Sequence, residues 1–218
     1  MASALVRRIQ ALRCFVVLAR DPRRLDVVFS LRESLDDPSA LEPVLTRLRA
    51  LPGPSAALRT RPRMPRIDLP TLRAMPVGSV GQAYAAFMDS QGLDPNAIPK
   101  LEATDDAGYL TAHLYETHDV WHVITGFAPD VAGELGLQAF YLAQLEGPLP
   151  VAILAAGLLN TLGTLGEARA RMDAIVRGWE LGNRARPFFG VRWGDLFARP
   201  LVEVRRELGV EPALAAAA

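Results

Sequence analysis

Two of the three histidines in this 218-residue chain, His118 and His122, lie four residues apart in the segment HDVWHVITGFAPDVAGE. On a helix this spacing puts both imidazoles on one face, about 6 Å apart along the axis, so both can reach one metal ion. Asp119 lies about 100° round the helix from His118 and can ligate the metal or orient a histidine. Glu134 follows a Gly-Phe-Ala-Pro turn, and the next helix can return its carboxylate to the same point.

Two nitrogen and two oxygen donors suit zinc, ferrous iron or manganese, whereas calcium prefers oxygen alone and closed structural zinc sites usually contain cysteine. A mixed donor set usually leaves a coordination position for water or substrate, which favours catalysis. The spacing alone also fits a surface pair or a hydrogen-bonded core pair of histidines. With that alternative open, the residue types predict a divalent metal site, with zinc preferred over iron and manganese.

Composition limits the classes of partner. Lys+Arg and Asp+Glu both number 24, so the whole chain has no general attraction for nucleic acid, and we expect no nucleic-acid partner. The hydrophobic content of 50% is ample for a large core. Cys14 is the only cysteine, which excludes an internal disulfide and fits a reducing compartment such as the cytoplasm.

Helical periodicity runs along the chain, and no stretch shows the sustained period-two alternation of a half-buried strand. We therefore expect an all-α fold: a single-domain helical bundle over residues 1–218, with about seven to nine helices and one long connector. The expected helices are 3–20, 22–34, 38–51, 79–92, 105–125, 130–146, a segment within 147–166, 164–181 and 200–209.

Prolines separate the first three helices from the rest. Asp21-Pro22 and Asp37-Pro38 are typical helix starts, an acidic cap followed by proline. Between Pro52 and Pro70, five prolines predict an irregular Pro/Arg-rich connector whose arginines are solvated or paired. A domain boundary there is the alternative, but the preceding 60 residues form too small an apolar set to stand comfortably alone.

Two apolar segments bear on a membrane role. The N-terminal MASALVRRIQALRCFVVLARDPRR has too many interspersed arginines for a secretory signal; we favour an ordinary surface helix over a membrane-surface contact or a transit-peptide remnant. Residues 147–166 carry no charge over nearly the length needed to cross a bilayer. Pro148, Pro150 and Asn160 dilute this segment, so we favour a buried helix over a lipid-facing one.

The pattern H-D-x-x-H, then eleven residues, then E, is similar to the signature of the ubiquinone (coenzyme Q) biosynthesis protein COQ-four family. MPVGSVGQAYAAFMDSQGLDP, around Gly78 and Tyr84, resembles the family's Leu-Pro-x-Gly-Thr-x-Gly-x-x-Tyr stretch, and the resemblance covers most of the chain. Other matching positions are Pro76, Gly81, Met88, Tyr109, Gly126, Pro129, Gly133, Gly182, Trp193 and Arg205. The chain departs from the family at His113 and Tyr115, where members often carry arginines, and at Gly194, where an acid is usual. We expect His113 on a helix surface, with a substrate contact as the alternative.

The resemblance implies an all-helical homodimer, a bacterial member of the family, that acts on polyprenylated benzoate and quinone intermediates alongside other ubiquinone-biosynthesis enzymes. It would lie in the cytoplasm, peripheral at the inner membrane. The implied activity is metal-dependent removal of the C1 carboxylate from a polyprenylated 4-hydroxybenzoate, with or without hydroxylation at that carbon. His118, His122 and Glu134 would be ligands, and Asp119 a fourth ligand or a general acid/base.

Two other classes of function compete with a decarboxylase. A lipid-binding scaffold could present quinone intermediates to partner enzymes and use its metal only structurally. A phosphohydrolase of the His-Asp superfamily needs a histidine well upstream of an adjacent His-Asp pair. Here the only upstream histidine, His113, lies five residues away on the same expected helix, which disfavours this class.

Overall fold

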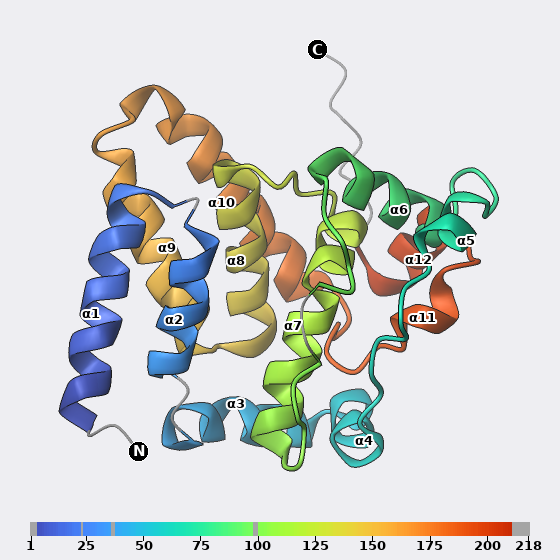
Figure 1. Cartoon of the computed structure of the whole chain (residues 1–218), viewed down its shortest axis with the longest axis horizontal. Helices are drawn as coiled ribbons and strands as arrows, with labels where there is room; N and C mark the ends of the chain where they lie inside the picture. Colours follow the sequence, from blue (N-terminus) through green and yellow to red (C-terminus); the bar gives the residue numbers. More distant parts are fainter. Residues whose placement is uncertain (1–3, 23, 36–37, 98–99, 211–218) are drawn as a thin grey trace. The chain divides into compact units, whose positions relative to one another are not determined.

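A computed structural model describes residues 4–22, 24–35, 38–97 and 100–210, in which every regular element is a helix (Figure 1). The helices are α1 (Ala4–Arg20), α2 (Leu25–Leu35), α3 (Pro38–Ala50), α4 (Pro52–Thr60), α5 (Leu69–Arg73), α6 (Val80–Gln91), α7 (Asp106–Thr125), α8 (Val131–Leu145), α9 (Pro148–Thr161), the 3₁₀ turn η1 (Leu165–Glu167), α10 (Ala168–Arg184), α11 (Trp193–Leu196) and α12 (Leu201–Leu208). The predicted all-α class is confirmed. The described ranges hold twelve α-helices, more than expected, because α4, α5 and α11 are short.

The chain groups into two compact units, each assembled from two separate stretches of sequence. One unit comprises residues 1–47 and 128–183, and the other comprises 48–127 and 184–218, as far as the structure describes them. The single domain expected over 1–218 stays a prediction. The expected helix start at Asp37-Pro38 touches residues 36–37, outside the described ranges, although α3 begins at Pro38. The start expected at Pro22 is instead a turn, and α2 begins at Leu25.

In the first unit α1 packs against both α2 and α9, and α9 packs against α8 (Figure 1). Cys14 and Leu18 of α1 are buried against Val27 and Leu31 of α2 and Ala156 of α9. The segment 147–166 does form a helix, α9, but the prediction that it is buried was wrong for one of its faces. Val151, Leu158 and Leu159 are 43–51% exposed, because only the side with Ala156, Gly157 and Thr161 meets neighbouring helices. None of the helices in the described ranges combines the length and apolar character needed to span a bilayer.

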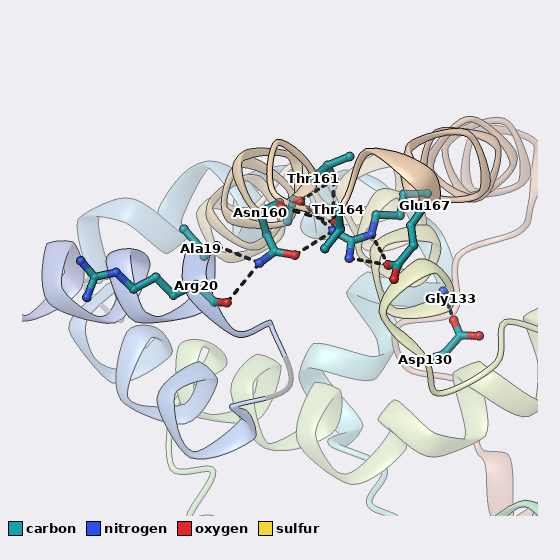
Figure 2. Close-up of polar contacts among 10 residues, drawn as sticks. Ala19, Arg20, Asp130, Gly133, Asn160, Thr161, Thr164 and Glu167 are labelled. Carbon is teal, nitrogen blue, oxygen red and sulfur yellow. Dashed lines mark hydrogen bonds and ion pairs between the residues drawn. The ribbon is translucent and has the colours of Figure 1, made fainter.

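Polar residues fasten the end of α9. Asn160 donates from its amide to the carbonyl oxygens of Ala19 and Arg20 at 3.0 and 3.2 Å, as Figure 2 shows. The buried guanidinium of Arg171 donates to Asn160 Oδ1 at 2.9 Å and to Thr161 Oγ1 at 3.1 Å, and it also pairs with Glu167. The polar residues that interrupt the apolar sequence of α9 therefore connect this helix to α1 and α10.

In the second unit α6 packs against α5, α7 and α12. Ser79 caps α6 by accepting a hydrogen bond from the Gln82 amide, and Gly92 ends it in the left-handed conformation, so both predicted boundaries are confirmed. Tyr84, Ala85 and Met88 form the buried side of α6, whereas Ala86 is exposed.

The Pro/Arg-rich connector is less irregular than predicted. Pro52 lies in the first turn of α4, where a backbone amide has no helical acceptor, so proline does not prevent the helix. The extended part between α4 and α5 is held to α7 through its arginines. Arg63 forms an ion pair with Glu116 and donates to the Leu101 carbonyl, and Arg61 donates to the carbonyl of Thr104. The arginines were expected to be solvated or paired, and these two are paired.

Candidate metal centre

Helix α7 carries the histidine pair between two capped ends. The side chain of Asp105 accepts from the Gly108 amide at the start, and Gly126, at φ +75°, ends the helix with its amide donating to the His122 carbonyl. Both boundaries agree with the sequence prediction. A left-handed residue lets the chain reverse direction one helical turn after His122, and glycine adopts that conformation without steric cost.

The two imidazoles face each other. His118 Nε2 and His122 Nε2 lie 3.3 Å apart, and the ring planes are nearly perpendicular, at 89°. His122 is buried, and its Nδ1 lies 3.0 Å from the Phe127 carbonyl oxygen. Because a carbonyl oxygen only accepts, Nδ1 must carry the proton, and His122 Nε2 therefore presents its lone pair. Phe87 of α6 stacks on the same imidazole, with ring centroids 5.5 Å apart.

This geometry fits a divalent metal. Two imidazole nitrogens bound to one tetrahedral zinc ion at its usual bond lengths are about 3.3 Å apart. A backbone carbonyl that accepts from the opposite nitrogen of a histidine is the usual means of fixing the ligating tautomer. The donor chemistry and the spacing of His118 and His122 thus agree with the prediction from sequence.

Glu134 lies in the first turn of α8. Asp130 caps this helix by accepting from the Gly133 amide at 2.7 Å, as Figure 2 shows. A side chain at Gly133 would lie 1.9 Å from the Ala128 carbonyl oxygen, so the turn before Glu134 requires glycine. His118, His122 and Glu134 each offer one ligand atom, and these three atoms lie within 4.8 Å of one another. The three residues form a possible metal-binding group.

Asp119, the fourth predicted residue, is not a member of this group of ligand atoms. It is half-buried on α7 and interacts electrostatically with Tyr84 of α6. Burial, and secondarily the charge of Asp119, raise the pKa of the Tyr84 phenol well above its usual value. Tyr84 therefore stays protonated near neutral pH and can donate a hydrogen bond but cannot act as a base.

Sequence reasoning assigned no structural role to Arg205, a half-buried residue of α12. Its Nε donates to the Ile124 carbonyl and one terminal nitrogen donates to the Val123 carbonyl, both at 2.9 Å. These carbonyls belong to the last turn of α7, where no helical amide remains to satisfy them. A cation is also favourable at a helix C-terminus. Arg205 thereby holds the turn that contains His122, and only its match to the family pattern pointed to it.

The expectation that His113 lies on a helix surface was wrong. This residue is buried, and its Nε2 accepts a hydrogen bond from the Gly190 amide at 3.0 Å. The Tyr109 hydroxyl lies 3.4 Å from His113 Nδ1 and 3.0 Å from the Pro62 carbonyl oxygen. Burial lowers the pKa of His113 to about 4, so the imidazole is neutral at physiological pH. Its contacts join α7 to two loops of the same unit.

Known proteins resemble the chain over most of its length. The family profile described as coenzyme Q (ubiquinone) biosynthesis protein Coq4 matches residues 3–213. The mitochondrial ubiquinone biosynthesis protein COQ4 of Pyricularia oryzae is 32% identical over 198 residues, which cover 88% of this chain and 64% of that protein. The protein of the same name from Yarrowia lipolytica is 32% identical over 197 residues, or 88% of this chain and 74% of its own length.

A solved structure shares the fold. A crystal structure from Nostoc punctiforme, provisionally assigned to ubiquinone biosynthesis, superposes with a TM-score of 0.82 and 28% sequence identity. The superposition covers 94% of this chain and 99% of the Nostoc chain. The family match and the superposition therefore each extend over most of the chain.

Proposed function

Because the chain belongs to the Coq4 family of coenzyme Q (ubiquinone) biosynthesis proteins, we propose that it acts in that pathway as a metal-dependent carbon-carbon lyase. Its substrate is a polyprenylated 4-hydroxybenzoate intermediate, which loses its C1 carboxylate at the membrane surface. The observation that carries this proposal is the group formed by His118, His122 and Glu134, with two nitrogen donors and one oxygen donor. Three protein ligands leave a fourth position of a tetrahedral ion available to substrate.

Each residue has a defined part in this proposal. When bound, a divalent metal would serve as a Lewis acid toward the substrate carboxylate or ring oxygen. Breaking the bond between C1 and the carboxylate releases carbon dioxide, and C1 takes up one proton. We assign that proton transfer to Asp119, which follows the ligand His118 directly and stands apart from the three ligands. Tyr84, kept protonated by its environment, is available as a hydrogen-bond donor.

Zinc is the preferred metal, because a site with two histidines and one carboxylate is a common catalytic zinc arrangement. Ferrous iron also binds two histidines and one carboxylate and, supplied with dioxygen and a two-electron reductant, would allow an oxidative variant in which C1 gains a hydroxyl group, carbon dioxide is released and the second oxygen atom leaves as water. Manganese is the third possibility. Metal identity thus separates simple decarboxylation from the oxidative form.

The family assignment also supports proposals about location and partners. We infer attachment to the cytoplasmic face of a bacterial inner membrane, assembly as a homodimer and contact with other enzymes of the pathway. The prenyl tail needs apolar surface, and α9 offers it through the exposed side chains of Val151, Leu158 and Leu159. By contrast, the apolar residues of α8 are mostly buried, so residues 136–145 belong mainly to the core and offer the tail little surface.

The first test measures bound metal by elemental analysis on protein purified without a histidine tag. Wild type is compared with a His118→Ala, Glu134→Ala double variant and with Glu180→Ala, which removes an exposed carboxylate from α10 as a control. We expect one equivalent of zinc, iron or manganese in wild type and in the control, and none in the double variant. Absence of metal from wild type, even after anaerobic reloading, would refute the metal centre.

The second test is turnover. Purified protein loaded with the metal found above should release labelled carbon dioxide from carboxyl-labelled polyprenyl-4-hydroxybenzoate in detergent micelles. His118→Ala should abolish this release after the same stripping and reloading. Stoichiometric metal without turnover would instead favour the non-catalytic scaffold, in which the metal is structural and the protein presents lipid intermediates to partner enzymes.

A further inference from the structure

Helix α1 carries apolar side chains on two opposite sides. Its inner side packs into the first unit, where Cys14 and Leu18 are buried and contact α2 and α9. An ordinary surface helix would carry polar residues on the remaining side. The outer side of α1 departs from that pattern.

The outer side presents an apolar stripe to solvent. Val6, Ile9, Leu12 and Val16 are between 41% and 63% exposed. They follow one another at intervals of three, three and four residues, so they share one face of the helix over almost three turns. Single exposed apolar residues are ordinary on protein surfaces, whereas a continuous stripe along one helix face marks a binding surface.

The charges on α1 are all of one sign. The helix contains Arg7, Arg8, Arg13 and Arg20 and no acidic residue. At 100° per residue, Arg13 and Arg20 lie within about 50° of the centre of the apolar stripe. Arginine can place its aliphatic stem along an apolar surface while its guanidinium reaches a more polar layer. An apolar stripe flanked only by cations complements a surface that is apolar inside and anionic outside.

We propose that α1 is a lipid-binding helix that lies flat on an anionic membrane surface, with Val6, Ile9, Leu12 and Val16 inserted at the boundary between headgroups and acyl chains. This inference deepens the membrane-surface part of the proposed function and names the element that makes the contact. It does not depend on the metal centre, which lies on other helices.

Another exposed apolar stripe offers an internal comparison. Met172, Val176 and Trp179 of α10 are 44–49% exposed and also share one helix face. Asp173 and Glu180 accompany them, so this stripe combines both signs of charge. Charge complementarity with anionic lipid therefore favours α1 over α10.

The experiment is co-sedimentation of the full chain with vesicles at low ionic strength. Vesicles of phosphatidylcholine with about one third phosphatidylserine are compared with vesicles of phosphatidylcholine alone. Each basic residue near an anionic surface contributes about 1 kcal/mol. Arg13→Gln with Arg20→Gln should therefore lower the partition coefficient on anionic vesicles by about 30-fold. Ile9→Gln with Leu12→Gln should lower it by tenfold or more.

Matched controls keep the result specific. Two double variants make the same changes on α10: Met172→Gln with Val176→Gln, and Arg169→Gln with Arg177→Gln. Both should bind vesicles as wild type does. His118→Ala should also bind normally, which separates failure of this inference from failure of the metal chemistry. The side chains altered on α1 and α10 are exposed in the native fold, and circular dichroism checks that each variant retains its helices.

Three results would overturn the proposal: wild type that does not sediment with anionic vesicles, binding that is equal on neutral and anionic vesicles, or full binding by the Ile9→Gln, Leu12→Gln variant. A change of oligomeric state in that variant, with vesicle binding intact, would assign the stripe to contact between copies of the chain instead.

Discussion

At the scale of single residues, the histidine pair depends on groups outside the candidate metal-binding set. His122 is held by the Phe127 carbonyl at Nδ1 and by Phe87 against its ring face. Arg205 holds the turn between His122 and Phe127, because its guanidinium donates hydrogen bonds to the carbonyl oxygens of Val123 and Ile124. The orientation of a ligand is thus set by residues far from it in the sequence.

Replacing Arg205 should weaken metal binding. Arg205→Met keeps an apolar stem but leaves two carbonyls of α7 without their donors, which loosens the last turn. We expect the zinc dissociation constant, measured by chelator competition, to rise about tenfold, within the range found when groups supporting metal ligands are removed. Arg206→Met alters the adjacent exposed arginine and should leave zinc affinity unchanged. Equal affinities for wild type and Arg205→Met would show that Arg205 does not position the site.

His113 should make the fold sensitive to acid. Its folded-state pKa of about 4 lies below its unfolded value of 6.5, so the unfolded chain binds the proton more strongly. Its contribution to stability is present above pH 6.5 and is lost as pH falls from 6.5 towards 4. The difference amounts to about 3 kcal/mol.

Urea unfolding at a series of pH values tests this. His113→Gln removes the titrating group, so we expect a lower free energy of unfolding at pH 7.5 and a flatter pH dependence between 6.5 and 4. The charged groups nearest to His113, Glu116 and Arg63, act on its pKa in opposite directions. Parallel pH profiles for wild type and variant would contradict the assigned shift.

At the scale of elements, close approach of α10 to α8 requires glycine. A side-chain carbon at Gly178 would lie 1.9 Å from the Gly136 carbonyl oxygen, and one at Gly182 would lie 2.7 Å from the Ala143 side chain. The two glycines are four residues apart on one face of α10. The backbones can therefore meet along this line without intervening side chains.

Gly178→Ala should consequently destabilise the fold despite the better helix propensity of alanine. The clash is with backbone, which cannot move aside locally, so we expect a loss of about 2–3 kcal/mol in the free energy of unfolding. Gly166→Ala is the matched control, because no atom lies within 4 Å of the added carbon. Its free energy of unfolding should change by less than about 0.5 kcal/mol. Equal stability of the Gly178→Ala variant and wild type would mean that the helices are not packed this closely.

At the scale of the whole molecule, metal binding and folding should be linked, because a metal bound only by the native chain stabilises it. At a free metal concentration one hundred times the dissociation constant, the expected gain is about 2.7 kcal/mol, which corresponds to about 5–10 °C in Tm for a chain of this size. Differential scanning fluorimetry of stripped protein with added zinc measures this shift. The His118→Ala, Glu134→Ala variant should show none, and a shift of equal size in that variant would place the binding elsewhere.

Local signals in the sequence determined much of the candidate site. Capping residues at both ends of α6 and α7 fixed where these helices begin and end, and Asp130 fixed the start of α8. Such signals are local, because a cap acts on backbone groups within one turn of itself. The four-residue spacing of His118 and His122 fixed their common face for the same reason. The spacing of eleven residues after His122 in the family pattern then supported Glu134 as a further ligand.

Only the tertiary structure decided the features that depend on distant partners. The chain alone could not show that His113 is buried, that Arg205 caps α7 or that α9 leaves one face exposed. Each of these follows from which surface another segment covers, and in the pairing of Arg205 with Ile124 that segment is 81 residues away. Periodicity reports the direction of a side chain from its own helix, whereas burial and pairing are set by long-range packing.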